Sequence, residues 1–266
     1  MLTDYWPRRV GPAEPLALAL RDHHRTGRSR RVHATRTDGV SFTIETDEYF
    51  TLDGSLAELD RLSLDRCRGR ILDVGAGAGR HALALQERGH DVMAIDLSPI
   101  CVALCKARGV DNVRRLDVMA LASEAEEPIG RFDTIFFGMQ TIGVAGGVVA
   151  LGRLLARLTD LLAPDGELIV DSSALREAWE GDQSDTTPSR GEIVLSMRYR
   201  GWFGERFPWL YLAQDDLEEV AAGAGFEMEK LGSVESGEYL AALRLRKWDA
   251  TPRPSSGRTN QERERE

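Results

Sequence analysis

Three acidic residues and a glycine-rich run have the types and spacing of a nucleotide-binding site. The run, Gly75-Ala76-Gly77-Ala78-Gly79, follows the apolar stretch 71–74 and precedes a helical pattern. Glycines between a strand and a helix let backbone N–H groups approach a ligand closely, because no side chain stands in the way. Asp73 lies just before the run, Asp96 ends the next apolar stretch, and Asp117 ends the third.

The three carboxylates have the chemistry to bind a nucleoside. Asp96 lies 21 residues after Gly75, where it can accept hydrogen bonds from both ribose hydroxyls. Asp117 is placed to reach an adenine amino group. Because parallel strands present their carboxyl ends at one crevice, we expect these acids to lie together. Any one of them could instead cap a helix, but the three together indicate a ligand site.

The glycine run also permits a dinucleotide alternative. In the G-x-G-x-x-G register that begins at Gly75, the last position is Arg80, so the fingerprint fails there. The register that begins at Gly77 passes with Ala82, but it leaves two residues between the strand and the motif. An NAD(P)-dependent oxidoreductase is therefore an alternative that Arg80 and Asp117 disfavour.

Alternating strands and helices must position these residues. We expect strands over 71–74, 92–96, 113–116, 132–137 and 168–171, and helices over 80–88, 98–109 and 151–162. This alternation predicts an α/β fold, a doubly wound and mostly parallel sheet with right-handed crossovers. The stretches 226–231 and 239–245 are expected to pair as two final, antiparallel strands.

One domain with flanking segments is expected, with boundaries at about 32 and 248. The segment 1–31 is predicted to be flexible and the tail 249–266 disordered. Small β-rich lid elements are expected at about 32–60, where Asp38-Gly39 predicts a type I′ hairpin, and at about 185–212, after a polar loop at 176–191. Candidate walls of a substrate pocket are Tyr49, Phe50, Trp202, Phe203 and Trp209, the alternative being that they form the core of the lid.

Composition argues against several classes of function. A net charge of −9 and a pI near 5.2 disfavour a nucleic-acid partner, because binding to a phosphate backbone needs a cationic face. The three cysteines lack zinc-ligand spacing, so no metal site is predicted. No stretch has the length of a membrane span or of a signal-peptide core. We expect a cytoplasmic protein without a membrane partner, and the oligomeric state is left open.

Taken together, these motifs resemble the class I S-adenosylmethionine-dependent methyltransferases. The resemblance covers about residues 53–246 and rests on the stretches 72–79, 94–98, 116–118, 132–135 and 162–168. It implies a Rossmann-like, seven-stranded sheet whose last strand is antiparallel, with S-adenosylmethionine as cofactor. A catalytically silent module that only binds this cofactor is a second alternative.

The resemblance also implies roles for individual residues. Asp73 and the backbone of Gly75, Ala76, Gly77 and Gly79 would border the methionine part of the cofactor, and Asp96 would hold the ribose. Asp117 with Val118 would border the adenine, and Phe137, Gly138 and Gln140 the sulfonium; Leu97 is a further cofactor-binding candidate. The sequence lacks an Asn/Asp-Pro-Pro-Tyr/Phe motif after the fourth strand, which disfavours an amide or adenine-amino acceptor.

Direct in-line methyl transfer to a small-molecule acceptor is the predicted reaction. The leaving group is neutral, so catalysis can rest on positioning and on the exclusion of water. A general base is needed only if the acceptor carries a proton in its ground state. His33, His81 and Asp171 are candidates near the mouth of the site. His81 fits the first turn of its helix and Asp171 a cap, so no catalytic residue is assigned.

Overall fold

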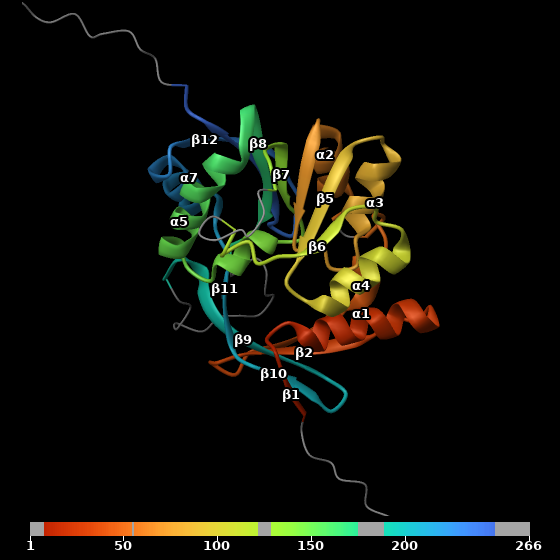
Figure 1. Ribbon diagram of the computed structural model, residues 1–266. Coiled ribbons are helices and arrows are strands. Elements are labelled where there is room, and N and C mark those ends of the chain that lie inside the picture. Colours follow the sequence, from red (N-terminus) through yellow and green to blue (C-terminus); the bar gives the residue numbers. More distant parts are fainter. Residues whose placement is uncertain (1–7, 55, 122–128, 175–188, 248–266) are drawn as a thin grey trace, which may run out of the picture.

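The computed structural model describes residues 8–54, 56–121, 129–174 and 189–247, and its larger sheet has seven strands (Figure 1). These are β4 (Arg70–Val74), β5 (Asp91–Asp96), β6 (Val113–Arg115), β7 (Phe132–Phe137), β8 (Leu162–Ser172), β12 (Phe226–Ser233) and β13 (Tyr239–Leu245). Their order is β12-β13-β8-β7-β4-β5-β6, and β13 is antiparallel to both neighbours while the other pairs are parallel. The predicted mostly parallel sheet with an antiparallel final strand is confirmed.

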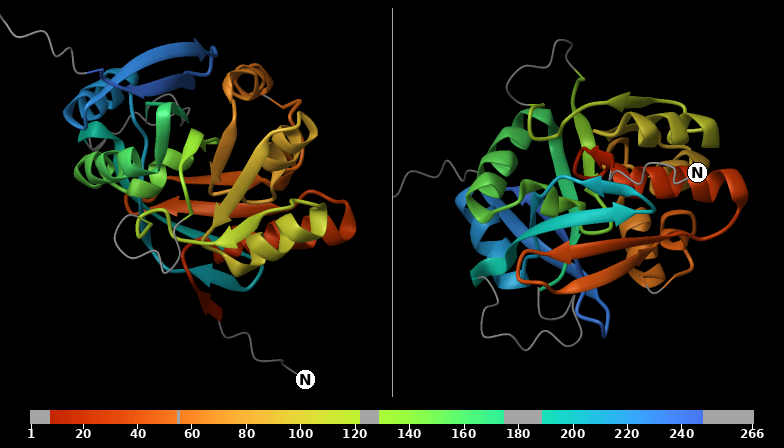
Figure 2. Two further views of the ribbon diagram at one scale, coloured as in Figure 1. Left: turned by 45° about the horizontal axis from the view of Figure 1, so that its top comes forward. Right: turned by 90° about the horizontal axis from the view of Figure 1, so that it is seen from below.

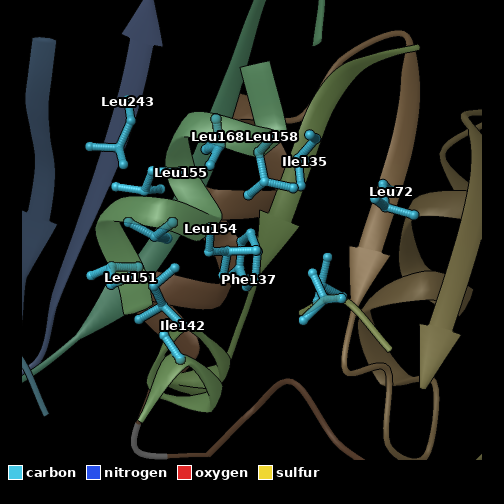
Figure 3. Packing of buried hydrophobic residues seen from close by; sticks show 14 of the residues in the cluster. Leu72, Ile135, Phe137, Ile142, Leu151, Leu154, Leu155, Leu158, Leu168 and Leu243 are labelled. Carbon is cyan, nitrogen blue, oxygen red and sulfur yellow. The ribbon is translucent and has the colours of Figure 1, made fainter. Parts of the chain in front are cut away.

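Helices cover both faces of this sheet. One face carries α2 (Ala57–Arg66), α3 (Arg80–Glu87) and α4 (Pro99–Arg108), and the other carries α5 (Val148–Leu158) and α7 (Gln214–Gly223). Successive strand residues point to opposite faces, so Ile71 packs with the first set of helices and Leu72 with the second. Figure 3 shows the leucines of α5 packed against Phe137 and Ile135. The 3₁₀ helices η2 (Thr141–Ala145) and η3 (Thr159–Leu161) flank α5.

Helix α4 begins and ends where the sequence predicts. The Ser98 side chain accepts a hydrogen bond from the N–H of Ile100, Pro99 is the first helical residue, and Gly109 ends the helix with a φ of 99°. Strand β8, in contrast, begins at Leu162 rather than 168. Its pairing with β7 shifts register between Phe132 and Thr134, so the stretch 164–166 is an irregularity inside the strand.

A second sheet, here called the lid sheet, lies across the carboxyl ends of the parallel strands (Figures 1 and 2). It consists of β1 (Arg8–Val10), β2 (Arg31–Arg36), β3 (Ser41–Glu45), β9 (Glu192–Tyr199), β10 (Trp202–Gly204) and β11 (Phe207–Leu210), with η1 (Thr46–Tyr49) after β3 and η4 (Ser189–Gly191) before β9. The order is β1-β10-β9-β2-β3, and β11 also pairs with β9. The two segments expected as separate lid elements therefore join through β2 and β9.

The expectation of a flexible segment over 1–31 is wrong for the part that the structure describes. Helix α1 (Glu14–Thr26) follows β1 and lies between the lid sheet and α4. Ala17 and Leu20 pack with residues of α4, and Leu18 and Ala19 pack with residues of the lid sheet. The short apolar run 16–20 packs between two layers, while Arg21 and Arg25, which follow it in the helix, are exposed.

The predicted hairpin is present, but its turn differs from the predicted type. Strands β2 and β3 pair antiparallel, and the N–H of Gly39 donates to the carbonyl oxygen of Arg36. A type I′ turn needs positive φ at both central residues, and here Gly39 has a φ of 93° whereas Asp38 is not in this region. The turn is thus a type I turn followed by a left-handed glycine. The predicted tail and residues 176–188 of the predicted loop lie outside the described residues.

Candidate cofactor and acceptor site

The glycine-rich loop between β4 and α3 depends on backbone conformations that L side chains rarely adopt. Gly75 and Gly79 have φ values of 69° and 79°. A Cβ atom placed on Gly75 would lie 2.5 Å from Cγ2 of Thr141, and one on Gly79 would lie 2.9 Å from Cγ2 of Val110. The alternate glycines therefore let the loop pass close to η2 on one side and to the chain after α4 on the other.

Asp96, at the end of β5, fixes this loop from the neighbouring strand. One carboxylate oxygen accepts the N–H of Gly77 at 2.9 Å and the other accepts the N–H of Ser98 at 2.8 Å. Each oxygen keeps a further lone pair for a ligand hydroxyl. The adjacent Leu97 side chain is 58% exposed. A carboxylate beside an exposed apolar surface fits a nucleoside, because the first can bind the sugar and the second can cover a base.

Asp73 lies beneath the loop rather than on its open side. Its side chain is 2% exposed, and one carboxylate oxygen has no hydrogen-bond partner among the residues that the structure describes. Burial, together with the nearby charge of Asp96, raises the pKa of Asp73 to about 7, although a hydrogen bond from the N–H of Ala82 opposes the shift. Asp73 is a buried negative charge close to the glycine loop.

Asp117 and Val118 follow β6 at the same edge of the sheet. The N–H of Leu116 donates to the carbonyl oxygen of Asp96, which brings the segment beside β5. A carboxylate oxygen of Asp117 accepts the N–H of Met119 at 2.9 Å, and Val118 is buried. The structure thus gathers Asp73, Asp96 and Asp117 at one end of adjacent strands, as predicted from the sequence.

A fourth acid, Asp171 near the carboxyl end of β8, binds the loop after β7; the sequence suggested it as a candidate base or as a cap. The two oxygens of Asp171 accept the N–H groups of Met139, at 2.9 Å, and Gln140, at 2.5 Å. Phe137 itself is fully buried in the core, so of the predicted sulfonium neighbours only Gly138 and Gln140 belong to the loop. The signal was the same as for the other acids, a carboxylate at the carboxyl end of a parallel strand.

Arg80, which breaks the dinucleotide fingerprint, ties α3 to the lid. Its guanidinium donates to the carbonyl oxygens of Glu48 and Thr51, each at 2.8 Å, and to Asp60 at 2.7 Å. The same Asp60 oxygen lies 2.8 Å from Nε2 of His81. His81 is buried, and burial lowers its pKa although Asp60 opposes this shift. His81 is therefore held in a buried cluster by Asp60, and this arrangement does not favour it as a general base.

The clamp by Arg80 places Tyr49 over the glycine loop. A Cβ atom on Gly77 would lie 3.6 Å from Cδ1 of Tyr49. Burial raises the pKa of the Tyr49 hydroxyl above its ordinary value, and the charges of Glu48 and Tyr211 add to this shift. Tyr49 is thus the predicted pocket residue that the structure brings to the loop.

The other predicted pocket residues lie elsewhere. The ring centroids of Phe50 and His23 lie 4.1 Å apart, and Cζ of Arg108 lies 4.8 Å from the ring centroid of Phe50. Trp202 packs with the cluster of α1 and the lid sheet. Phe203 is 42% exposed, and it points to the opposite face of the lid sheet from Trp202 because neighbouring strand residues alternate. Trp202 and Phe203 therefore do not line one space with Tyr49.

A different set of aromatic residues lies on the inner face of the lid sheet. This aromatic stripe, half-buried around Ile193 and Leu195, comprises Phe42, Phe207, Trp209 and Tyr211. Trp209 approaches η2 closely, since a Cβ atom on Gly143 would lie 2.6 Å from its Nε1. His33, on the other face, is exposed and pairs with Thr43 and Arg198.

The described ranges contain neither a metal site nor a membrane-spanning helix. Within them, no group of three or more His, Cys, Asp or Glu residues could hold a metal ion. No helix of those ranges is both long enough and apolar enough to cross a membrane.

Comparisons with known proteins show which class of enzyme this chain belongs to. Residues 51–231 match a family model described as a methyltransferase domain, and the chain belongs to this family. It is 35% identical to an S-adenosylmethionine-dependent methyltransferase from Bacteroides fragilis, solved with S-adenosyl-L-homocysteine, over 88% of this chain and 96% of that one, with a TM-score of 0.77.

Two curated relatives differ in what their names say they modify. A demethylmenaquinone methyltransferase of Thermus thermophilus is 39% identical over 185 residues, which are 63% of this chain and 78% of the relative. A tRNA U34 carboxymethyltransferase of Glaesserella parasuis is 30% identical over 151 residues. That alignment covers 55% of this chain and 43% of the relative, so the chain spans less than half of its length.

The protein is an S-adenosylmethionine-dependent methyltransferase of class I. The oxidoreductase and the silent-module alternatives are overturned by the family match and by the relatives. The site fits this cofactor, because burial raises the pKa values of Asp73, Asp96 and Asp171, and one buried oxygen of Asp73 has no partner among the described residues. A cofactor that carries a sulfonium and an ammonium group would compensate these charges.

Proposed function

We propose that this methyltransferase acts on a small, flat and largely apolar molecule that binds between the aromatic stripe and the loop after β7. The observation that carries the proposal is the lid sheet, whose inner face presents half-buried aromatic rings next to η2. Aromatic walls with a few polar groups are typical of small-molecule pockets. The net charge of −9 supports a small acceptor over a polynucleotide, whose binding needs many cationic contacts.

We also propose how the cofactor lies. Asp96 would bind the ribose hydroxyls, and Leu97, Asp117 and Val118 would border the adenine. The backbone of the loop Gly75, Ala76, Gly77 and Gly79, with the buried charge of Asp73, would border the methionine part. The methyl-donating end would then lie near Gly138 and Gln140. The support is the gathering of these residues at one edge of the sheet, where ligands of open α/β sheets bind.

The chain contributes chiefly positioning to the reaction. When bound, the cofactor would supply a methyl group from its sulfonium, and the sulfonium would become a neutral thioether once the methyl group is transferred. The lid sheet and η1 would exclude water, and Tyr49 with Trp209 would orient the acceptor for in-line attack. His81 is hydrogen bonded to Asp60 and does not act as a base in this scheme. An acceptor that ionises easily, such as an acidic hydroxyl, would need no strong base.

The test is formation of S-adenosylhomocysteine with a panel of acceptors: a demethylated quinone in its reduced form, a simple phenol, an amino sugar and tRNA. We expect the highest kcat/KM with a flat aromatic acceptor. Trp209→Ala is expected to raise the KM for that acceptor by about ten-fold, as loss of a buried aromatic contact does. Trp202→Ala, in the other cluster, is the matched control and should leave KM unchanged. Turnover with tRNA alone would refute the proposal.

A further inference from the structure

The loop after β7 contains two consecutive non-glycine residues in the left-handed region. Met139 has a φ of 54° and Gln140 a φ of 59°. The other described non-glycine residues with positive φ occur singly. Such residues cost free energy and persist only where the surrounding structure enforces them. A pair of them at the edge that holds the site requires a specific restraint.

Asp171 provides that restraint. Its carboxylate binds both strained residues at once, one oxygen to the N–H of Met139 and the other to the N–H of Gln140. Hydrogen bonds to a charged acceptor are stronger than neutral ones. The carboxylate is anchored in β8, the neighbour of β7 in the sheet, and it is 7% exposed. The loop is thus tied to a rigid element through two bonds to one side chain.

On its other side the loop packs closely against Phe136 and His81, which leaves no room for a side chain at Gly138. A Cβ atom on Gly138 would lie 2.7 Å from Cζ of Phe136 and 2.8 Å from Cε1 of His81. His81 is itself fixed by Asp60. In addition, Oε1 of Gln140 is buried without a hydrogen-bond partner among the described residues. A buried acceptor in a fixed loop is poised to receive a donor from a bound molecule.

We propose that Asp171 is a positioning residue that holds the Met139-Gln140 backbone, and with it the Gln140 side chain, against the methyl-donating end of the cofactor. Asp171 does not touch the cofactor in this account but acts through the loop. The proposal rests on the cofactor placement proposed above and is independent of which acceptor is methylated.

The clamp depends on the ionisation of Asp171. A protonated carboxyl keeps one good acceptor oxygen, so one of the two N–H bonds would be lost. Burial, together with the charge of Asp60 on α2, raises the pKa of Asp171 to about 7, although the two N–H bonds and Arg80 on α3 oppose this shift. His81 also faces this region through its contact with Gly138. The clamp should therefore weaken as the pH falls through about 7.

The test compares Asp171→Asn with Glu167→Gln. Both replace a buried acid of β8 by its amide, but Glu167 binds Arg66 and Arg244 away from the loop. Affinity for S-adenosylhomocysteine is measured by calorimetry at pH 6 and pH 8. Hydrogen exchange of a peptide covering 137–142 is measured at both pH values. Neither readout needs an acceptor, so a failure of the proposed acceptor class leaves the result unaffected.

At pH 8 we expect Asp171→Asn to bind about ten-fold more weakly than the wild type, with faster exchange in 137–142, as loss of a charge-assisted hydrogen bond predicts. At pH 6 the two proteins should converge, because the wild-type carboxyl is then protonated. Asp73, whose pKa burial also raises, is present in both proteins, so the comparison isolates Asp171. Glu167→Gln should lower the melting temperature but keep wild-type affinity at both pH values.

A rescue completes the test. Glycine adopts positive φ without strain, so Met139→Gly in the Asp171→Asn background should restore part of the affinity at pH 8. Equal affinity of Asp171→Asn and wild type at pH 8 would overturn the proposal. An equal loss of affinity in Glu167→Gln would also overturn it, since the effect would then be one of general stability.

Discussion

Acids at the ends of parallel strands make up the site, yet their surroundings differ. Asp96 has a backbone N–H on each oxygen, whereas Asp73 has one oxygen without a partner in the described structure. Both oxygens of Asp171 accept hydrogen bonds from the strained loop after β7. Sequence spacing predicted where Asp73, Asp96 and Asp117 lie. It could not predict what each carboxylate binds, because the partners come from other strands and loops.

Asp96→Ala is expected to weaken binding of S-adenosylhomocysteine by about 1–3 kcal/mol, through loss of charge-assisted hydrogen bonds to the ribose and of the bond that fixes Gly77. Calorimetric titration measures the change. Asp91→Ala is the matched control, since Asp91 begins the same strand and its exposed side chain pairs with Arg70. Unchanged affinity in a folded Asp96→Ala protein would remove the ribose assignment.

Asp73→Asn should stabilise the free protein progressively as the pH rises. The pKa of Asp73 is about 7 in the fold, against an ordinary value of 3.8, so the folded chain binds more protons than the unfolded chain between these values. Stability therefore falls as pH rises through this window, and the full cost is present above pH 7.

Removing that charge should raise the melting temperature relative to wild type by about 3 °C more at pH 8 than at pH 5. Thermal unfolding at the two pH values gives the comparison, with the exposed Asp91→Asn as control. If the gain in melting temperature of Asp73→Asn over wild type is the same at pH 5 and pH 8, the ionisation of Asp73 costs the fold little free energy.

Elements of the larger sheet follow from local pattern, whereas the lid does not. Strand and helix periodicity placed β4, β5 and α4 to within a residue or two, because each is stabilised by its own alternation and caps. The pairing of β2 with β9 joins distant segments, and neither segment specifies its partner. Helix α1 escaped prediction because its apolar face is short and is buried between two layers. Trp202 and Phe203 lie away from Tyr49, and their position also depends on long-range pairing, since β10 pairs with β1 and β9.

Arg80→Gln tests the link between α3 and the lid. The change removes donors to the carbonyls of Glu48 and Thr51 and leaves buried Asp60 without its cationic partner. We expect a loss of about 3–5 kcal/mol in the free energy of unfolding, as for other broken buried ion pairs. Hydrogen exchange over 46–51 should become faster.

The control for this change is Arg88→Gln, at the end of the same helix, whose side chain is partly exposed and pairs with Asp65. It should alter stability by no more than about 0.5 kcal/mol. If exchange over 46–51 is the same in Arg80→Gln and wild type, Arg80 does not hold the lid segment.

At the scale of the molecule, the two sheets contribute different parts of the candidate site. The larger sheet has helices on both faces, and the lid sheet lies across its carboxyl edge (Figure 1). Four acids gather at that edge, and aromatic residues lie on the inner face of the lid sheet. The first arrangement suits a cationic cofactor, and the second suits a flat acceptor. The first could be predicted from sequence, because it repeats strand by strand, while the second depends on long-range pairing.

The most direct measurement follows the methyl group itself. Enzyme is incubated with methyl-labelled S-adenosylmethionine and an extract separated into small molecules, RNA and protein, with Asp96→Ala in parallel. Our account predicts that label enters the small-molecule fraction in amounts equal to the S-adenosylhomocysteine formed, and that Asp96→Ala reduces both. Label recovered in RNA or protein, with none in small molecules, would contradict it.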